Sequence, residues 1–333
     1  MNVIFLCENP QLFASVYAKE VIEKLQKQAT IDPHVYTKAE LLAAPQKFSQ
    51  TQVIFSTWGM PSLTEAEIET CFPALECVFY AAGTVQSFAR PFLRRGIQVF
   101  SAWAANAVPV AEYTVAQIIL AGKDFYCQTR LLSQKRLADA QKRDAGCFGN
   151  FRQKIGLIGC GMIGSLVAQM LKNYDLEVLA FDPFMSPEKA KQLGVTPCTL
   201  EELFATCSVV SNHLANNAET QRMLQYKHFA SMPPYAVFLN TGRGAQVIEE
   251  DLVRALTERP DLTAVLDVTH PEPSPLDHPF YSLPNCFLTP HIAGSKGGEV
   301  VRMAEYMVGE YEKYVAGQPT AYAVTMKMLE TMA

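Results

Sequence analysis

The fold is decided by the stretch Lys154-Ile155-Gly156-Leu157-Ile158-Gly159-Cys160-Gly161-Met162-Ile163-Gly164. An apolar, strand-like run precedes the GxGxxG motif of Gly159, Gly161 and Gly164, and an amphipathic helical pattern follows it. In such a motif the first glycine permits a tight turn, the second lets the backbone approach a pyrophosphate, and the third lets helix and strand pack closely. The helix N-terminus would hold the pyrophosphate, because its free N–H groups and its dipole favour an anion. The motif therefore predicts a dinucleotide site, with an ordinary strand-to-helix turn as the alternative.

An acidic residue follows at the distance expected for a ribose contact. The apolar run Val178–Phe181 ends at Asp182, roughly 20 residues beyond the motif. A carboxylate at this point accepts both hydroxyls of the NAD ribose and repels the 2′-phosphate of NADP. The next three residues, Pro183, Phe184 and Met185, supply no cation that would bind that phosphate. We therefore expect NAD as the cofactor.

Strand-like and helical runs alternate in two series along the chain. The first series occupies residues 1 to about 100, and the second runs from Lys154 to Thr289. Repeated β-α-β units of this kind predict parallel sheets with helices on both faces, so we expect an α/β fold of two doubly wound domains. A helical pattern over Glu299–Val315 follows the second series, and we expect this helix to return to the first domain.

Two long helical patterns lie outside the second series. One covers Leu12–Gln28, and the other runs from Pro109 towards Leu131, before a polar stretch over Ser133–Arg143. The second pattern is richer in apolar residues than one helix face needs. It predicts a homodimer interface, with a helix wholly buried inside one subunit as the alternative.

The composition excludes several classes of protein. Of 333 residues, 49% are hydrophobic and 18% are charged, and 28 Lys and Arg against 33 Asp and Glu give a net charge of −5. This is enough apolar material for two cores, and it excludes a disordered chain. The acidic balance argues against nucleic acid or an anionic membrane as partner, and no apolar run approaches the ~20 residues of a membrane span. The nine cysteines are scattered without a CxxC, so we expect no disulfide framework, no metal site and a cytoplasmic location.

Three polar residues near strand ends form a candidate catalytic set. Arg243 follows the strand that ends at Asn240, Glu272 lies in a Pro-rich loop after Val268, and His291 follows the last strand. Ligands of open α/β sheets bind at these carboxyl ends. A histidine can exchange protons near neutral pH, a glutamate beside it favours the imidazolium form, and an arginine can grip a carboxylate. Each of the three alone is more often a structural residue, so the set is a hypothesis.

Taken together, these motifs resemble the D-isomer-specific 2-hydroxyacid dehydrogenases, a family that includes phosphoglycerate dehydrogenase and glyoxylate/hydroxypyruvate reductase. The resemblance extends from about Val78 to the terminal helix, and more weakly through the first strands. It implies a Rossmann NAD-binding domain over residues 102–294, inserted in a flavodoxin-like substrate domain made of residues 1–101 and 295–333. It rests on these ordered segments: Ile158–Gly164 with Phe181–Pro183, Asn240–Gly244, Leu266–Pro273 and Thr289–Gly294.

The resemblance also implies a role for each matching residue. Arg243 would bind the substrate carboxylate and carbonyl oxygen, and Glu272 and His291 would be the acid/base pair. Asp267 would hydrogen-bond the nicotinamide carboxamide, and Gly83 would face the substrate carboxylate from the first domain. The remaining cofactor contacts would come from Gly159, Gly161, Met162, Ile163, Gly164, Asp182, Thr241, Gly294 and Thr84.

The implied reaction interconverts a 2-oxo acid and its D-2-hydroxy acid by hydride transfer with NAD. A phosphorylated substrate would need clustered cations. The candidates Arg90, Arg94 and Arg95 lie in a helical pattern, where we expect solvated surface charges, so a small unphosphorylated 2-oxo acid is favoured. The competing interpretation is an NAD-sensing, corepressor-like protein that binds partners without turnover.

Overall fold

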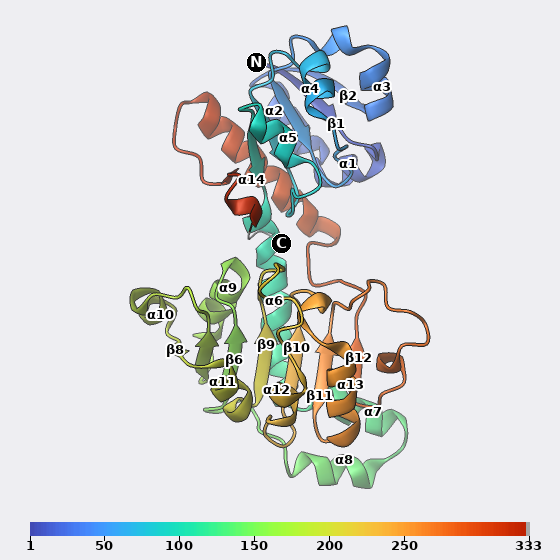
Figure 1. Cartoon of the computed structure of the whole chain (residues 1–333), viewed down its shortest axis with the longest axis vertical. Helices are drawn as coiled ribbons and strands as arrows, with labels where there is room; N and C mark the ends of the chain where they lie inside the picture. Colours follow the sequence, from blue (N-terminus) through green and yellow to red (C-terminus); the bar gives the residue numbers. More distant parts are fainter. Residues whose placement is uncertain (331–333) are drawn as a thin grey trace. The chain divides into compact units, whose positions relative to one another are not determined.

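The computed structural model describes residues 1–330 and divides the chain into two compact units (Figure 1). Unit 1 contains Met1–Asn106 and the segment that begins at Ser295, and unit 2 contains Ala107–Gly294. Residues 331–333, the end of the segment expected to close the first domain, lie outside the described residues. Each unit has its own sheet and its own hydrophobic core.

Unit 1 is built on a six-stranded sheet in the order β13-β5-β4-β3-β1-β2. Five strands are parallel, and the edge strand β13 pairs antiparallel with β5. The parallel part has the strand order of flavodoxin-like folds, as expected. The strands are β1 (Asn2–Leu6), β2 (Thr30–Tyr36), β3 (Val53–Ser56), β4 (Cys77–Tyr80), β5 (Gln98–Ser101) and β13 (Ala323–Val324). The helices are α1 (Pro10–Val16), α2 (Lys19–Gln26), α3 (Lys38–Ala43), α4 (Glu65–Cys71), α5 (Ala89–Arg94) and α14 (Val300–Val315).

Helix α14 supplies much of the core of unit 1. It packs beside α1 and α2 and against β4. Its Tyr311 is buried, with ring contacts to Phe55 on β3 and Phe79 on β4. Two helices of this unit begin with capping boxes, in which the side chains of Thr37 and Thr64 each cap the helix that follows.

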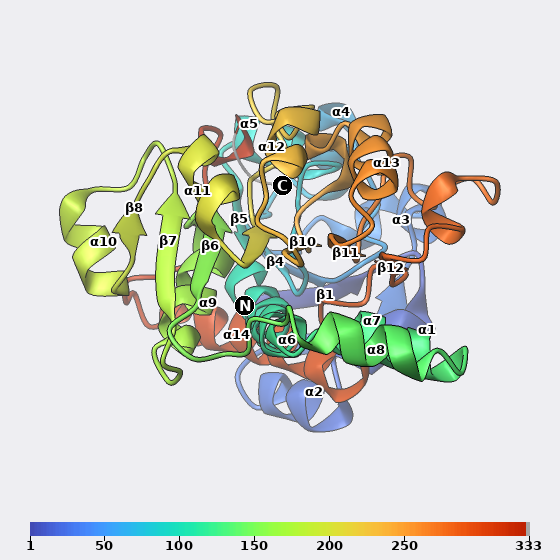
Figure 2. The same ribbon diagram turned by 90° about the horizontal axis from the view of Figure 1, so that it is seen from below.

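Unit 2 is built on a seven-stranded parallel sheet in the order β12-β11-β10-β9-β6-β7-β8. Counted from β6, this is the doubly wound Rossmann order with one further strand, and it confirms the predicted fold class. Helices α11 to α13 cover one face, and α6, α7 and α9 cover the other (Figure 2). The strands are β6 (Lys154–Ile158), β7 (Glu177–Phe181), β8 (Thr196–Pro197), β9 (Val209–Asn212), β10 (Val237–Asn240), β11 (Thr263–Leu266) and β12 (Cys286–Leu288). The helices are α6 (Trp103–Gly122), α7 (Phe125–Ser133), α8 (Leu137–Asp144), α9 (Met162–Leu171), α10 (Pro187–Leu193), α11 (Leu200–Thr206), α12 (Tyr226–Ala230) and α13 (Glu249–Glu258).

Both long helical patterns are interrupted in the structure. The pattern over Leu12–Gln28 is divided between α1 and α2, because Tyr17 turns inward and its hydroxyl donates to the carbonyl of Ser56. The pattern from Pro109 is divided between α6 and α7, because Asp124 has a φ of +51° and cannot continue a helix. The polar stretch that follows overlaps α8.

Helix α6 corrects the expectation that no apolar run reaches membrane-spanning length. It has 20 residues and a mean hydropathy of 1.2, and it is the one helix within residues 1–330 that is long and apolar enough to cross a membrane. More than half of its apolar window, 56%, is buried. Ala111, Val115 and Ile118 pack into the core of unit 2. Core helices commonly pass this test, so the helix alone assigns no membrane role.

Candidate functional site

The glycine loop between β6 and α9 has the shape that a dinucleotide pyrophosphate requires. Gly159 has a φ of +86°, which glycine adopts without strain. A Cβ on Gly164 would lie 2.0 Å from the carbonyl oxygen of Gly159, so only glycine allows the helix to approach. A Cβ on Gly161 would meet nothing within 4 Å, which leaves open space at the helix N-terminus. The three glycines therefore fit a nicotinamide dinucleotide, each for a different reason.

Asp182 lies at the end of β7 and is tied to the glycine loop. Its Oδ2 accepts the N–H of Cys160 at 2.8 Å, and its Oδ1 accepts the N–H of Phe184 at 2.9 Å. Sequence reasoning missed a cation here, because Lys189 on α10 donates from Nζ to the carbonyl of Cys160 at 2.7 Å. Asp182 thus binds the backbone N–H of Cys160, and Lys189 binds its backbone carbonyl.

The sheet order reverses between β6 and β9, at the carboxyl ends where open α/β sheets bind ligands. His213 follows β9, and its carbonyl oxygen would be 3.0 Å from a Cβ on Gly159. Burial lowers the pKa of His213 to about 4, so the ring is neutral at physiological pH. Its Nε2 pairs with the hydroxyl of Ser211 at 2.9 Å. We interpret His213 as packing behind the glycine loop.

His291 and Glu272 are brought together from neighbouring strands. Glu272 follows β11 and His291 follows β12, and Oε1 of Glu272 lies 2.6 Å from Nδ1 of His291. The backbone of His291 has a φ of +52°, an uncommon conformation for a residue other than glycine. Both side chains border a cavity of about 630 Å³ that is also lined by Asp267 and Tyr281. The pair therefore faces open space with Nε2 of His291 left for a ligand.

Asp267 fixes the backbone that carries His291. Its buried carboxylate accepts hydrogen bonds from the hydroxyl of Thr289 at 2.6 Å and from the N–H groups of Ile292 and Ala293 at 2.8 and 2.9 Å. Its carbonyl accepts the N–H of His291 at 2.9 Å. A carboxylate has about four acceptor sites, so three donors leave one for a further ligand. The network on Asp267 could not be read from the sequence.

Arg243 rests on a buried network of amides that sequence reasoning also missed. Its Nη1 donates to the carbonyl of Gly242 at 2.8 Å, and its N–H donates to Oε1 of Gln246 at 3.2 Å. Asn212 joins the network by donating to Asn240 at 3.0 Å and to Gln246 at 2.6 Å. The sequence does carry a signal for this network, because Asn212 and Asn240 each end an apolar strand.

The loops of Arg243 and Glu272 lie against one another. A Cβ on Gly244 would be 2.1 Å from the carbonyl carbon of Thr269, so only glycine permits this approach. A cavity of about 280 Å³ is bordered by Arg243, Glu272 and Arg222. Arg243, Glu272 and His291 are thus gathered at one edge of the sheet in unit 2.

The other predicted contacts are more dispersed. Met162 and Ile163 are the first two residues of α9. Thr241 is nearly buried, and its hydroxyl pairs with Thr114 of α6 at 3.1 Å. The last residue of unit 2 is Gly294, while Gly83 and Thr84 belong to unit 1 and follow β4. Among the described residues, no three His, Cys, Asp or Glu side chains are grouped to hold a metal ion.

Comparison with known proteins places this chain in a family. The family described as D-isomer specific 2-hydroxyacid dehydrogenase, NAD binding domain, matches residues 115–293. A D-3-phosphoglycerate dehydrogenase of Archaeoglobus fulgidus is 30% identical over 238 residues, which is 71% of this chain and 44% of that protein. A glyoxylate reductase of Korarchaeum cryptofilum is 30% identical over 249 residues, which is 74% of each protein.

Solved structures agree on the fold. The D-mandelate dehydrogenase of Rhodotorula graminis superposes with a TM-score of 0.82 at 17% identity, over 97% of each chain. The chain spans less than half of the length of the phosphoglycerate dehydrogenase that it matches. The match over residues 115–293 and the identity to the glyoxylate reductase decide the assignment. The chain belongs to the D-isomer-specific 2-hydroxyacid dehydrogenase family.

Proposed function

We propose that this protein is an NAD-dependent oxidoreductase that interconverts a small 2-oxo acid and its D-2-hydroxy acid. The observation that carries the proposal is the 2.6 Å contact between Nδ1 of His291 and Oε1 of Glu272, at the sheet edge that also holds Arg243. The alternative of a corepressor-like binding protein has no observation of its own in its favour. The roles of unit 1 in substrate binding and of unit 2 in cofactor binding are part of the proposal.

The residues at this edge would divide the work as follows. Glu272 accepts the Nδ1 proton of His291, which fixes the ring and leaves Nε2 to deliver a proton to the substrate oxygen. Arg243 would bind the substrate carboxylate and polarise the adjacent carbonyl. Bound nicotinamide would supply or accept the hydride. Asp267 would use its remaining acceptor site to orient the carboxamide.

The cofactor contacts follow from the loop after β6. The N-terminus of α9, with Gly161, Met162 and Ile163, would receive the pyrophosphate, and Asp182 would accept the ribose hydroxyls. A carboxylate at this position supports NAD rather than NADP. One observation favours NADP. The ammonium of Lys189 on α10 donates to the carbonyl of Cys160 and so lies beside the glycine loop.

A small unphosphorylated substrate is supported by the arginines of unit 1. Arg94 pairs with Glu65 and Arg95 pairs with Glu69, both on the surface of α4. The guanidinium of Arg90 donates to the carbonyl of Leu329 at 3.4 Å. These three cations are therefore engaged within unit 1 and form no phosphate-binding cluster.

We also propose a homodimer in the cytoplasm. Phe125 and Leu132 on α7 and Leu137 on α8 are exposed, and these neighbouring helices are the surface that we propose to pair. The nine free cysteines support a reducing compartment. Light scattering at micromolar concentration should give twice the monomer mass, and a monomer mass would contradict the dimer.

The direct test is a panel of 2-oxo acids with NADH, including small unphosphorylated members and a phosphorylated one. Turnover should be highest with a small unphosphorylated acid, and the product should be the D isomer. Preference for the phosphorylated member would overturn the substrate assignment. Tight NADH binding with no turnover on any member would favour the binding protein instead.

A further inference from the structure

Unit 2 contains a second carboxylate–histidine pair, which the proposed reaction does not use. Glu249 is the first residue of α13 and is only 8% exposed. Its Oε2 lies 3.3 Å from Nε2 of His278. Its Oε1 accepts the backbone N–H of His270 at 2.8 Å. The hydrogen bond from His270 holds this buried carboxylate in one orientation.

The hydrogen bonds of His278 determine which of its nitrogens carries the proton. The backbone N–H of Phe280 donates to Nδ1 of His278 at 3.3 Å. Nδ1 is therefore the acceptor of the neutral ring, and the proton lies on Nε2. That nitrogen lies 3.3 Å from Oε2 of Glu249, so the ring packs beside the carboxylate. The hydrogen bond that fixes the Glu249 carboxylate is the one that its Oε1 accepts from the N–H of His270.

The backbone that Glu249 holds is the segment that leads to Glu272. His270 is two residues before Glu272, and Thr269 is the residue whose backbone lies against Gly244. The segment is therefore fixed from α13 through Glu249 and from the Arg243 loop through Gly244. In contrast, the side chain of Glu272 is itself partly exposed and depends on its backbone for placement.

We propose that Glu249 is a positioning residue, which holds the 269–272 segment so that Glu272 stays within hydrogen-bond distance of His291. This inference rests on the proposed function, because it assumes that the Glu272–His291 pair serves proton transfer. Glu249 touches neither substrate nor cofactor in this scheme. Its effect passes through the backbone of His270, and misplacement of a reacting group by about 1 Å can cost ~100-fold in rate.

The first test compares Glu249→Leu with Glu249→Gln, and Glu250→Gln is the matched control. Leucine removes the acceptor for the N–H of His270, whereas the amide oxygen of glutamine keeps it. We expect kcat of Glu249→Leu to fall by about 10- to 100-fold, while KM and the Kd for NADH stay within about twofold, and we expect Glu249→Gln to keep kcat near the wild-type value. Glu250 is exposed on the same helix turn, and its variant should behave like the wild type. An unchanged kcat in Glu249→Leu would overturn the proposal.

A double-mutant cycle separates this inference from the proposed function. If Glu249 acts through Glu272, Glu249→Leu should cause no further loss of kcat in a Glu272→Gln background. Equal losses in both backgrounds would overturn the positioning role alone. Full activity of the single variant Glu272→Gln would instead remove the acid/base pair, and with it the basis of the proposed function.

Glu249→Ala covers the case in which Glu249→Leu does not fold. Alanine removes the acceptor for the N–H of His270 without adding a larger apolar side chain. We expect a loss of about 10-fold or more in kcat, with unchanged NADH binding. A kcat near the wild-type value in Glu249→Ala would contradict the positioning role, because the segment would then hold Glu272 in place without this acceptor.

Discussion

The sheet of unit 2 has an ion pair at each end, and the two pairs differ in environment rather than in distance. At the carboxyl end, His291 and Glu272 approach to 2.6 Å with side chains 46% and 38% exposed. At the amino end, Arg143 and Asp124 also approach to 2.6 Å, but their side chains are only 11% and 7% exposed. Burial of both partners marks a pair that holds elements together, whereas exposure beside a cavity marks one that can meet a ligand.

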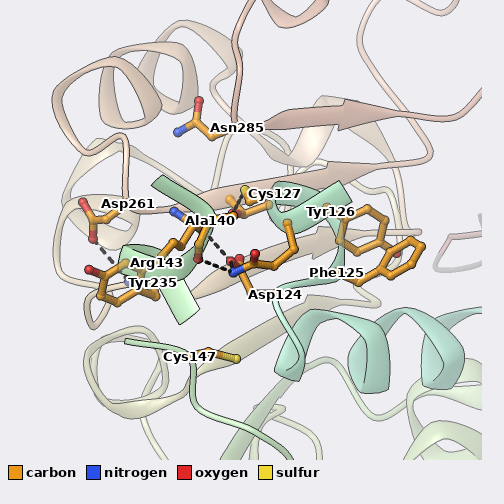
Figure 3. Close-up of polar contacts among 12 residues, drawn as sticks. Asp124, Phe125, Tyr126, Cys127, Ala140, Arg143, Cys147, Tyr235, Asp261 and Asn285 are labelled. Atoms are coloured by element: carbon orange, nitrogen blue, oxygen red, sulfur yellow. Dashed lines mark hydrogen bonds and ion pairs between the residues drawn. The ribbon is translucent and has the colours of Figure 1, made fainter. Parts of the chain in front are cut away.

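The buried pair is surrounded by partners that use its hydrogen-bonding capacity (Figure 3). Arg143 also donates to the hydroxyl of Thr263 at 3.1 Å and lies over the ring of Tyr235 at 5.3 Å. Asp124 also accepts from Gln128 at 3.3 Å. The cluster thereby fastens α7 and α8 to the start of β11. The two charged groups are thereby buried against one another, in contrast to the partly exposed ring of His291.

The largest effect should come from breaking the exposed pair. His291→Ala removes the proton donor, so kcat for 2-oxo acid reduction should fall by about 10²- to 10⁴-fold. The melting temperature and the Kd for NADH should change little, because the ring is exposed and makes few packing contacts. Stopped-flow assays and thermal unfolding would measure the two quantities. Near-normal turnover in this variant would show that the exposed pair of His291 and Glu272 does not carry the proton transfer.

Breaking the buried pair of Arg143 and Asp124 should lower the stability of the protein and leave its turnover almost unchanged. Asp124→Asn leaves Arg143 charged and unpaired in the interior, which should lower the free energy of unfolding by about 3–5 kcal/mol. At a temperature where the variant remains folded, kcat should stay within about twofold of the wild type.

The control lies on the same helix pair. Asp139 forms an exposed ion pair with Arg136, and Asp139→Asn should cost less than about 1 kcal/mol. Urea unfolding of the two variants tests the difference directly. Equal costs for Asp124→Asn and Asp139→Asn would mean that burial does not distinguish the pairs.

A smaller effect is expected for cofactor choice at the carboxyl end. Asp182→Ala removes the acceptor for the ribose hydroxyls, and hydrogen bonds to a charged group contribute about 1.5–3 kcal/mol. The Kd for NADH should therefore rise by roughly 10- to 100-fold, and the Kd for NADPH should rise less or fall.

Lys189→Gln tests the cation that α10 places against the glycine loop. It should leave NADH binding near the wild-type value and weaken NADPH binding. Fluorescence titration with both cofactors measures each Kd. Tighter binding of NADPH than of NADH by the wild type would overturn the assignment of NAD.

The sequence predicted those features that have a short-range cause. The glycine loop, the strand order and the placement of Glu272 near His291 follow from motifs and from the rule that ligands bind at carboxyl strand ends. The two long helices were predicted as unbroken, because the interruptions at Tyr17 and Asp124 depend on tertiary hydrogen bonds. Periodicity along the chain carries no information on such contacts.

The supporting residues of the site could not be predicted for the same reason. Asp267 was assigned to the cofactor, yet most of its hydrogen bonds fix the His291 backbone. Lys189 and Glu249 belong to helices whose charged residues look like ordinary solvated ones. Only the fold shows that one reaches the glycine loop and the other is buried against His270.

The smallest predicted effect is the contribution of Glu249 to the pH dependence of the free energy of unfolding. Burial raises the pKa of Glu249 from 4.5 to about 7, with the N–H of His270 acting in the opposite direction. The folded chain therefore holds this proton more tightly than the unfolded chain. Between about pH 4.5 and pH 7 the folded state binds more protons, so this contribution to stability is lost as the pH rises.

Glu249→Gln carries no titrating proton, so it isolates this contribution. The free energy of unfolding of the wild type, measured relative to that of the variant, should fall by about 2 kcal/mol between roughly pH 5 and pH 8. Urea unfolding at several pH values measures the difference, and Glu250→Gln should show no such trend because its side chain is exposed. A constant difference between wild type and Glu249→Gln would mean that Glu249 is ionised throughout. Burial would then have no effect on the pKa of this carboxyl, and exposure alone would not separate Glu249 from Glu272.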